Sequence, residues 1–262
     1  MKSLKKMFFG IKGFLFPSVC PLCGCSLMES MEIMYGICEK CLLTLIPEEE
    51  NKCNFCGRPL VSEKEFCLSC RREKEMSIDR FWVIFPYTGR YRNLLSAYKF
   101  NKNLTLAEYF AEQVLTIILN TEELKNACIV PVPPRPGKIK ENGWDQVDYL
   151  VKCIKKKAKK RINISYCLKR KKSKTQKSLD RQERLENLKG RIYIRQRLWS
   201  LAKCLEKILW KLSMSCKLSQ GVPKTALVID DVITTGSTME VCASVLKTAG
   251  VGKVYGLCLF YD

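Results

Sequence analysis

The sequence predicts an α/β protein in which a parallel sheet flanked by helices follows a small zinc-binding region. Residues 226–260 run through an apolar strand, a small hydroxyl-rich turn, a helix and a second strand, which is the order of a βαβ crossover. Residues 20–70 hold four C-x-x-C pairs, a spacing typical of zinc sites. With 262 residues, the chain is long enough for both parts.

Residues 1–19 are expected to form a short amphipathic lead, in which Phe8, Phe9 and Phe14 stand among lysines. Docking onto the following domain is favoured over contact with a membrane surface. No export cleavage site precedes Cys20, and no apolar run approaches the roughly 20 residues that span a bilayer. We therefore expect a cytoplasmic protein with reduced thiols.

The cysteine pairs predict two structural zinc sites, each held by four thiolates. The chain has sixteen cysteines and no histidine, so all-thiolate sites are consistent with its composition. A sequential partition of the pairs is simplest, and a cross-braced one stays open. A redox function would fit one pair, not four, and Cys25 is expected to be a bystander. The eight expected ligands are Cys20, Cys23, Cys38, Cys41, Cys53, Cys56, Cys67 and Cys70.

After a charged linker at residues 71–80, the pattern alternates between strand and helix. The predicted loop after the second strand is basic and rich in proline, and it should lie at the same sheet edge as Asp230, where open α/β sheets bind ligands. A plain proline-rich turn is the alternative. The segments are a strand at Phe81–Tyr87, helix over most of Gly89–Phe110 with a break at Lys99 and Phe100, a strand at Ala127–Val132 and the loop Pro133–Lys138.

The C-terminal crossover contains the pattern that most strongly predicts a ligand site. A buried strand at Ala226–Ile229 is followed by Asp230 and Asp231, a turn at Thr234–Thr238 and a helix at Met239–Ala249. Free N–H groups and the helix dipole stabilise an anion at such a turn. The acids suit sugar hydroxyls or a divalent metal, so the ligand expected here is a phosphorylated sugar. A capped helix with solvated acids is the alternative.

Positive charge is concentrated in one segment. Residues 151–220 hold 23 Lys and Arg against 4 acids, and so carry +19 of the chain's +20. Such a field attracts nucleic acid first and an anionic membrane second. Lys155–Lys157 and Lys169–Lys172, with Tyr166, are expected to offer phosphate contacts and a stacking surface for single-stranded DNA. A solvated lysine face is the alternative.

The stretch VIDDVITTGST, residues 228–238, resembles the phosphoribosyl pyrophosphate (PRPP) signature of type I phosphoribosyltransferases. That resemblance implies that Asp230 and Asp231 contact the ribose hydroxyls of PRPP. It also implies that the turn binds the 5′-phosphate through Thr234, Thr235, Gly236, Ser237 and Thr238.

Three further motifs extend the resemblance to most of the chain. Between the cysteine pairs and the PRPP loop stand YTGRYRNLLSAYKF (87–100), VPVPPRPGKIKENGWDQ (130–146) and LKRKKSKTQKSLDRQERLENLKG (168–190). This order is similar to the ComF family, bacterial phosphoribosyltransferase-like proteins with a double zinc ribbon that are associated with competence.

The ComF resemblance implies a type I phosphoribosyltransferase-like domain over residues 81–262 that binds PRPP with Mg²⁺, with an unassigned acceptor. It places Arg135 near the diphosphate and the mobile hood at Gln176–Arg184. It further implies a role in DNA uptake beside the uptake machinery. The alternative is a non-catalytic factor that binds single-stranded DNA and uses PRPP as a regulator or not at all.

Two departures from the family pattern stand out. Where the family usually has R-G-F-N-Q, this chain has Glu141, Asn142, Gly143, Trp144, Asp145 and Gln146, so an Arg is lost and an acid is gained. A basic amphipathic insertion occupies about residues 191–220. A packed surface helix is favoured there over a partner or membrane contact.

Overall fold

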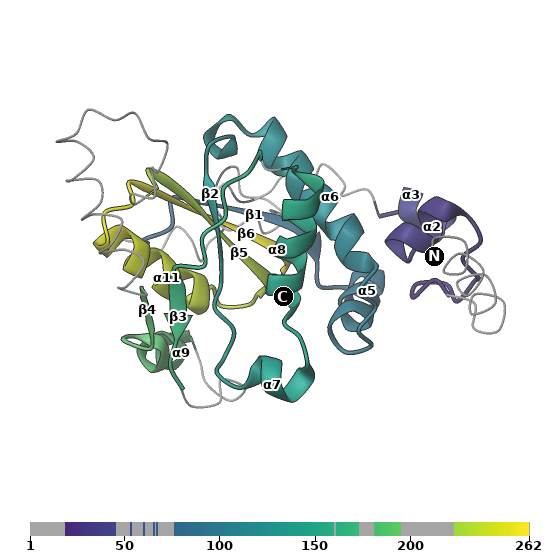
Figure 1. Ribbon diagram of the computed structural model, residues 1–262. Coiled ribbons are helices and arrows are strands. Elements are labelled where there is room, and N and C mark those ends of the chain that lie inside the picture. Colours follow the sequence, from purple (N-terminus) through teal and green to yellow (C-terminus); the bar gives the residue numbers. More distant parts are fainter. Residues whose placement is uncertain are drawn as a thin grey trace, which may run out of the picture.

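The computed structural model in Figure 1 shows a twisted sheet with helices on both faces. A small helical region lies beside the helices of one face. It describes residues 19–45, 53, 60, 65, 67, 76–159, 161–172, 181–194 and 223–261. Cys56, Cys70, residues 1–18 of the lead, residues 71–75 of the linker and residues 195–220 of the predicted insertion lie outside the described residues.

The main sheet has four parallel strands in the order β1-β6-β5-β2. Continuous apolar runs form its central strands because both of their faces are covered by helices. This arrangement confirms the predicted α/β class and the crossover from β5 to β6. The strands are β1 at Arg80–Pro86, β2 at Cys128–Pro131, β5 at Thr225–Ile233 and β6 at Lys253–Tyr261.

Strand β5 is longer than the sequence predicted, since it continues through the two acids to Ile233. On one side β6 pairs with it as far as Ile233, which lies opposite Tyr261. On the other side its pairing with β2 ends where Pro131 lies opposite Ile229. The acids therefore sit within a strand that has a neighbour on one side only, beside the point where β2 has ended.

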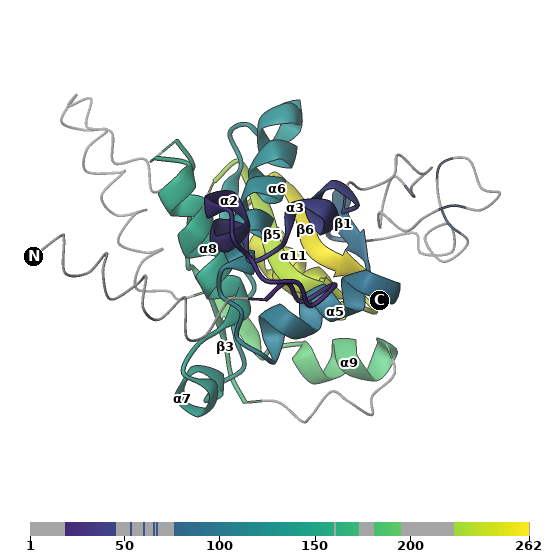
Figure 2. The same ribbon diagram turned by 90° about the vertical axis from the view of Figure 1, so that its right-hand side faces the viewer.

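Helices cover the two faces of the sheet, as Figures 1 and 2 show from two directions. Leu227 and Ile229 belong to one core with α5, α6 and α8, whereas Ala226 and Val228 belong to a second core with α11 and α9. Alternate residues of a strand point to opposite faces, which explains this division. The helices are α5 at Gly89–Lys99, α6 at Leu106–Asn120, α8 at Gln146–Lys157, α9 at Arg181–Leu188 and α11 at Ser237–Thr248.

Smaller elements complete the described chain. The predicted helical stretch at residues 89–110 is two helices, broken after Lys99 as expected. A second, antiparallel sheet joins β3 at Leu168–Arg170 to β4 at Ile192–Ile194, so the first residues assigned to the insertion belong to this pair. The remaining elements are α2 at Ser30–Tyr35, α3 at Glu39–Leu43, the 3-10 turn η1 at Glu122–Leu124 and α7 at Lys138–Asn142.

The N-terminal cysteine region packs directly on the α/β core. The Tyr35 hydroxyl donates to Glu112 of α6, and the Tyr35 ring meets Tyr109 edge-on at 5.8 Å between centroids. Ile37 and Leu45 are fully buried in the core that α6 covers. The two parts of the protein thus share one hydrophobic core. No helix among the described residues is long and apolar enough to cross a membrane.

Candidate functional site

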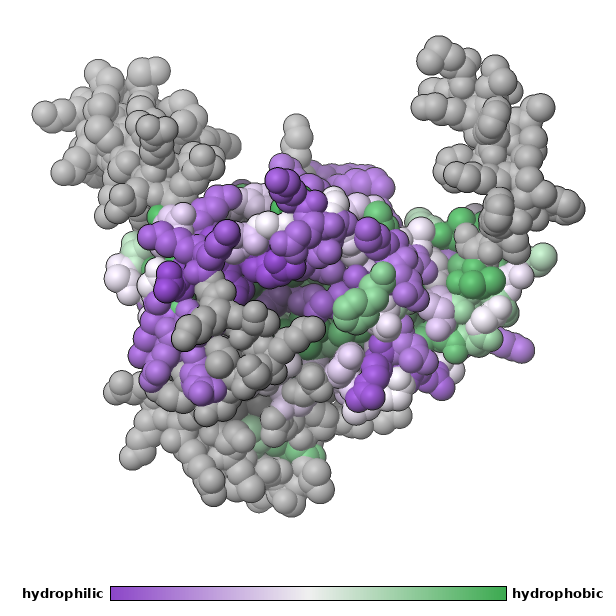
Figure 3. Space-filling view, turned by 90° about the horizontal axis from the view of Figure 1, so that it is seen from below, coloured by the Kyte–Doolittle hydropathy of each residue, from purple (hydrophilic) through white to green (hydrophobic). Residues whose placement is uncertain are grey.

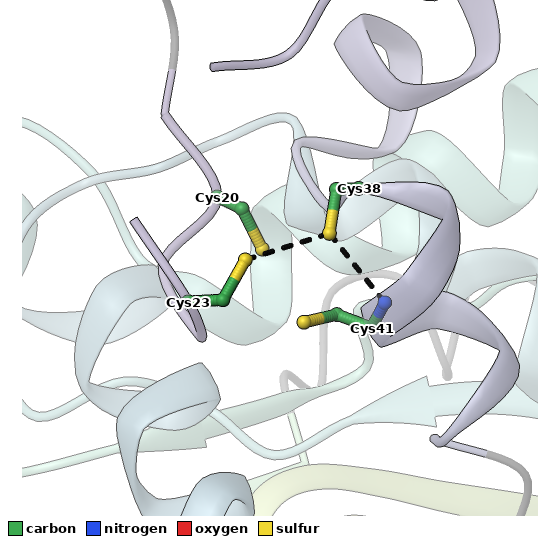
Figure 4. Close-up of side chains that lie close together, drawn as sticks. All are labelled: Cys20, Cys23, Cys38 and Cys41. Carbon is green, nitrogen blue, oxygen red and sulfur yellow. Dashed lines mark hydrogen bonds between the residues drawn. The ribbon is translucent and has the colours of Figure 1, made fainter. Parts of the chain in front are cut away.

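The first two cysteine pairs come together in space (Figure 4), with the sulfur atoms of Cys20, Cys23, Cys38 and Cys41 all within 4.8 Å of one another. Cys20 and Cys23 lie in a tight turn, in which the Gly24 N–H donates to the Cys20 carbonyl at 2.8 Å. Cys38 caps the N-terminus of α3, and its sulfur accepts the Cys41 N–H at 3.5 Å.

This arrangement fits a structural zinc ion. The Cys23 and Cys38 sulfur atoms are 3.6 Å apart, close to the separation of two thiolates that each lie about 2.3 Å from one tetrahedral zinc. The pairing that the described residues show is the sequential one. In the second set, Cys53 and Cys67 are buried, and the Cys67 N–H donates to the Cys53 sulfur at 3.3 Å.

Cys25, which the sequence analysis expected to be a bystander, lies next to this cluster. Its sulfur is 3.4 Å from that of Cys23, although it is exposed and outside the four-sulfur set. Hydrogen bonds from the backbone and thiol of Cys25, and then from Cys38, lower the pKa of the Cys23 thiol to about 6. Cys23 is therefore readily available as a thiolate, the form that binds metal.

The second site lies at the carboxyl ends of β2 and β5. The chain after β2 leads through α7 to α8, which covers one face of the sheet. The chain after β5 leads to α11, which covers the other face. Neighbouring strands whose connections leave on opposite faces form a crevice where open α/β sheets bind ligands. Figure 3, seen from the side of α7, shows a depression among hydrophilic side chains at this end of the molecule.

The acids of β5 have different partners because they alternate across the strand. Asp231 faces α5, where the Lys99 ammonium lies 3.2 Å from its Oδ2. Asp230 has the opposite orientation and interacts with the charge of Arg170, at the end of β3. The acids also touch through the backbone, since the Asp231 N–H donates to Asp230 Oδ1 at 2.9 Å. They form a site with two differently lined sides.

Burial and neighbouring charges shift the pKa values of Asp230 and Lys99. Burial, followed by the neighbouring Asp231 charge, holds the pKa of Asp230 well above its usual range. Burial alone would lower the pKa of Lys99, but attraction to Asp231 outweighs it and raises that pKa. Lys99 is thus firmly cationic, whereas Asp230 takes up a proton more readily than an ordinary aspartate.

The predicted phosphate turn leads directly into α11. Gly236 adopts φ +75°, and the helix begins at the buried Ser237. The hydroxyls of Thr235 and Ser237 lie 2.9 Å apart, while Thr234 is exposed and Thr238 half-buried. The opening N–H groups of a helix have no intrahelical acceptor, so this turn has the geometry expected of an anion site.

The loop after β2 supplies a cation, but an acid already holds it. Arg135 is exposed and donates to both carboxylate oxygens of Glu141 on α7, one of them at 3.0 Å. This contact raises the pKa of Arg135 and lowers that of Glu141. Asp145, the acid gained relative to the ComF pattern, is buried, caps α8 and pairs with Lys138 at 2.5 Å.

Two cations at this edge were missed by the sequence reasoning. Lys99 was predicted only as a helix end, and Arg170 only as part of a basic run. In β3 the residues alternate, so that Lys169 is exposed while Arg170 is half-buried and interacts with the charges of Asp230 and Arg135. The alternation of β3 would have separated Arg170 from its exposed neighbours, whereas nothing local indicates that Lys99 meets Asp231.

The basic run on α8 differs from the expected open phosphate-binding surface. Lys156 pairs with Glu108 at 3.0 Å, and Lys157 lies 3.4 Å from Glu112 and 3.6 Å from Glu108. Lys155 and Tyr166 are exposed. Part of the positive charge counted in the sequence is therefore neutralised by acids of α6.

Residues 11–71 match the family model described as Double zinc ribbon domain. The chain is 24% identical over 231 residues to Competence protein F of Haemophilus influenzae, covering 84% of this chain and 87% of that protein. The chain is a relative of the ComF competence proteins.

A second ComF relative supports the same relationship. Competence protein ComFC of Streptococcus pneumoniae is 25% identical over 224 residues, which cover 83% of this chain and 84% of that protein. Each match covers more than four-fifths of this chain, so the resemblance predicted from motif order is confirmed. The ribbon match and the cysteine cluster together indicate zinc binding.

Proposed function

We propose that this ComF relative binds PRPP at the carboxyl edge of β2 and β5 and acts in DNA uptake. The observation that carries the proposal is the convergence of three features on one edge. These are the acids of β5, the hydroxyl-rich turn before α11, and the basic loop after β2. A phosphorylated sugar with a second anionic group matches all three.

In this proposal, each feature binds a different part of PRPP. The turn Thr234–Thr238 at the start of α11 would bind the 5′-phosphate, and Asp230 and Asp231 would accept hydrogen bonds from the ribose hydroxyls. Arg135 would meet the diphosphate. The phosphate end would thus lie on the α11 side of the sheet and the diphosphate end on the α8 side.

Mg²⁺ fits this site as the counter-ion of the ligand rather than as an ion held by the acids. Asp231 already faces the Lys99 ammonium, and Asp230 interacts with Arg170, so neither carboxylate is a strong ligand for a second cation. Bound to the diphosphate, Mg²⁺ would neutralise the charge of the leaving group. Asp230 and Asp231 would orient the ribose.

The reaction compatible with this site is phosphoribosyl transfer. The bond from the anomeric carbon to the diphosphate oxygen breaks, its electron pair leaves with pyrophosphate, and a nucleophile adds to that carbon. The acids stabilise the cationic ribose between these events. Within the predicted hood at Gln176–Arg184, the described backbone at residues 181–184 begins α9, which packs on α11.

The cysteine region would hold two zinc ions, one in the cluster of Cys20, Cys23, Cys38 and Cys41 and one in the second set. The names of the relatives, both competence proteins, support a place beside the DNA-uptake machinery. We propose that the protein works on the cytoplasmic side.

A second candidate function is binding of single-stranded DNA without turnover. Exposed Tyr166 and the exposed lysines of the β3 region favour it, because aromatic rings and phosphate-binding cations are what single strands require. The discriminating measurement is affinity as a function of salt. Steep loss of affinity as salt rises supports phosphate contacts, and a flat response removes this candidate.

The test of the PRPP site is isothermal titration of Mg²⁺-PRPP into zinc-loaded protein. We expect the double variant Asp230→Asn/Asp231→Asn to bind at least about tenfold more weakly, since two hydrogen bonds to charged groups are lost. Glu123→Gln, which removes an exposed carboxylate from η1 at the opposite end of the sheet, is the matched control. Equal affinity in the double variant and the control would overturn the assignment of the acids.

The same titration with single-stranded DNA already bound tests whether the two candidate functions are joined. An altered PRPP affinity would connect the nucleotide site to DNA and justify a search for a transferred ribosyl group.

A further inference from the structure

Lys99 lies at the ligand-binding edge beside Asp231, but it has no part in the PRPP site proposed above. It is the last residue of α5, and its side chain is about one-third exposed, while that of Asp231 is only 12% exposed. The Oδ2 atom of Asp231 lies 3.2 Å from its ammonium, and the charge of Asp230 also acts on it. An ammonium has three donors, so Lys99 has further donors to offer to a bound molecule.

The backbone beneath Lys99 is held in place from the α8 side. The hydroxyl of the neighbouring Tyr98, whose side chain is fully buried, donates to the Gln146 carbonyl at 2.7 Å, and Gln146 Nε2 donates back to the Lys99 carbonyl at 3.4 Å. The ring of Tyr98 meets Trp144 edge-on at 5.3 Å. Lys99 is therefore fixed relative to the chain that leads from the Arg135 loop into α8.

This position places Lys99 on a definite side of the edge. Asp231 faces the core that α5 and α8 cover, whereas the hydroxyl turn leads into α11 on the opposite face. The loop that carries Arg135 connects β2 to α7 and α8, on the side of Lys99. A ligand whose 5′-phosphate lies at the turn has its other anionic end directed toward Lys99.

The ion pair between Lys99 and Asp231 does not by itself explain why a lysine stands at this position. A partly buried pair gains little net stability, because desolvation of the charges offsets their attraction. A cation that meets both a carboxylate on the protein and anionic oxygens on the ligand gains more, since charge-assisted hydrogen bonds are among the strong ones.

We infer that Lys99 is a ligand-binding residue whose ammonium bridges Asp231 and the diphosphate group of the bound sugar. This inference rests on the proposed PRPP site and extends it from one cation, Arg135, to a pair from two separate elements. Lys99 contributes affinity for the diphosphate and holds Asp231 ready for the ribose hydroxyl. It contributes little to the 5′-phosphate.

The experiment compares three ligands with a set of variants. Mg²⁺-PRPP, inorganic pyrophosphate with Mg²⁺, and ribose 5-phosphate are titrated into the zinc-loaded full chain. The variants are Lys99→Met, Lys99→Arg and, as the matched control, Lys140→Met, which removes an exposed lysine from α7 at the same end of the molecule.

We expect Lys99→Met to weaken binding of PRPP and pyrophosphate about tenfold or more, the loss of one charge-assisted hydrogen bond. Ribose 5-phosphate should change by less than about threefold, and Lys99→Arg should restore most of the diphosphate affinity. If Lys99→Met does not fold, Lys99→Gln gives the same comparison, and thermal unfolding of each variant establishes which one is used.

The outcomes separate this inference from the proposed function. If the parent binds PRPP and Lys99→Met matches Lys140→Met, or loses all three ligands equally, the role of Lys99 is overturned while the PRPP site stands. If the parent binds pyrophosphate through Lys99 but not PRPP, the PRPP proposal fails and the diphosphate contact survives. Binding of neither ligand overturns both.

Discussion

The cysteine cluster and the ligand-binding edge are built in opposite ways. The four thiols of the cluster come from one short stretch, Cys20 to Cys41, and converge on a single point. The edge takes Lys99 from α5, Arg135 from the loop after β2, Arg170 from β3 and the acids from β5. A metal site made of identical soft ligands can be specified by local spacing, whereas a site for a large ligand with several charges needs groups that only the sheet brings together.

The largest expected effect comes from breaking the local cluster. Cys38→Ser should reduce bound zinc from about two ions per chain to about one, because a four-thiolate site does not survive the loss of a ligand whose sulfur contacts both Cys23 and the Cys41 N–H. The measurement is metal analysis of the purified protein. The parent's stoichiometry is itself a test, since a value well below two contradicts the double ribbon.

Cys25→Ser is the matched control for that experiment. Cys25 lies 3.4 Å from Cys23 but outside the four-sulfur set, so its loss should leave the zinc content unchanged. A fall in zinc equal to that of Cys38→Ser would mean that Cys25 is a ligand and that the cluster is assigned incorrectly.

The contact between the two regions comes next in expected size. Tyr35→Phe removes the hydroxyl that donates to Glu112 and should lower the free energy of unfolding by about 1 kcal/mol, the usual worth of one such bond. Urea unfolding measures it, with Tyr193→Phe on β4 as control. PRPP affinity should stay within about twofold, and a larger change would show that the regions are energetically coupled.

Asp230, which lies on the α11 side, should make the stability of the protein depend on pH, with an effect similar to or smaller than that of Tyr35→Phe. Burial raises the pKa of Asp230 in the folded protein, so the folded state binds the proton more tightly than the unfolded chain does. Stability therefore falls as pH rises from the ordinary pKa of an aspartate through the raised one. Asp230→Asn lacks this loss, and its stability advantage over the parent should grow with pH across that window.

Chemical unfolding of both proteins at several pH values checks this expectation, with the comparison made above the pH at which zinc is lost. An advantage that stays constant or shrinks as pH rises would show that Asp230 is ionised without penalty in the folded protein.

The smallest expected effect concerns the acid that holds Arg135. Glu141→Gln removes the charge that pairs with this arginine, and both side chains are about half exposed. Because exposed ion pairs contribute little to binding or stability, pyrophosphate should bind only up to about fivefold more tightly. Isothermal titration measures the change, and weaker binding would mean that Glu141 positions Arg135 rather than restrains it.

Much of the fold was predictable because its information is local. The apolar runs at β1, β2, β5 and β6, the break after Lys99 and the helix after Gly236 each depend on a few neighbouring residues. The end of β5 was not predictable in this way. It extends to Ile233 because β6 continues beside it, and pairing between strands depends on residues far apart in the chain.

For the site, the sequence by itself determined the cysteine spacing, the acid pair and the hydroxyl turn, since each lies within one motif. The tertiary structure alone decided that Lys99 pairs with Asp231 and belongs at the edge, and that the charge of Arg170 acts on Asp230. It also decided that acids of α6 and α7 neutralise part of the basic charge. The physical reason is that a charge interacts through space, so its partner is chosen by packing of the elements and not by distance along the chain.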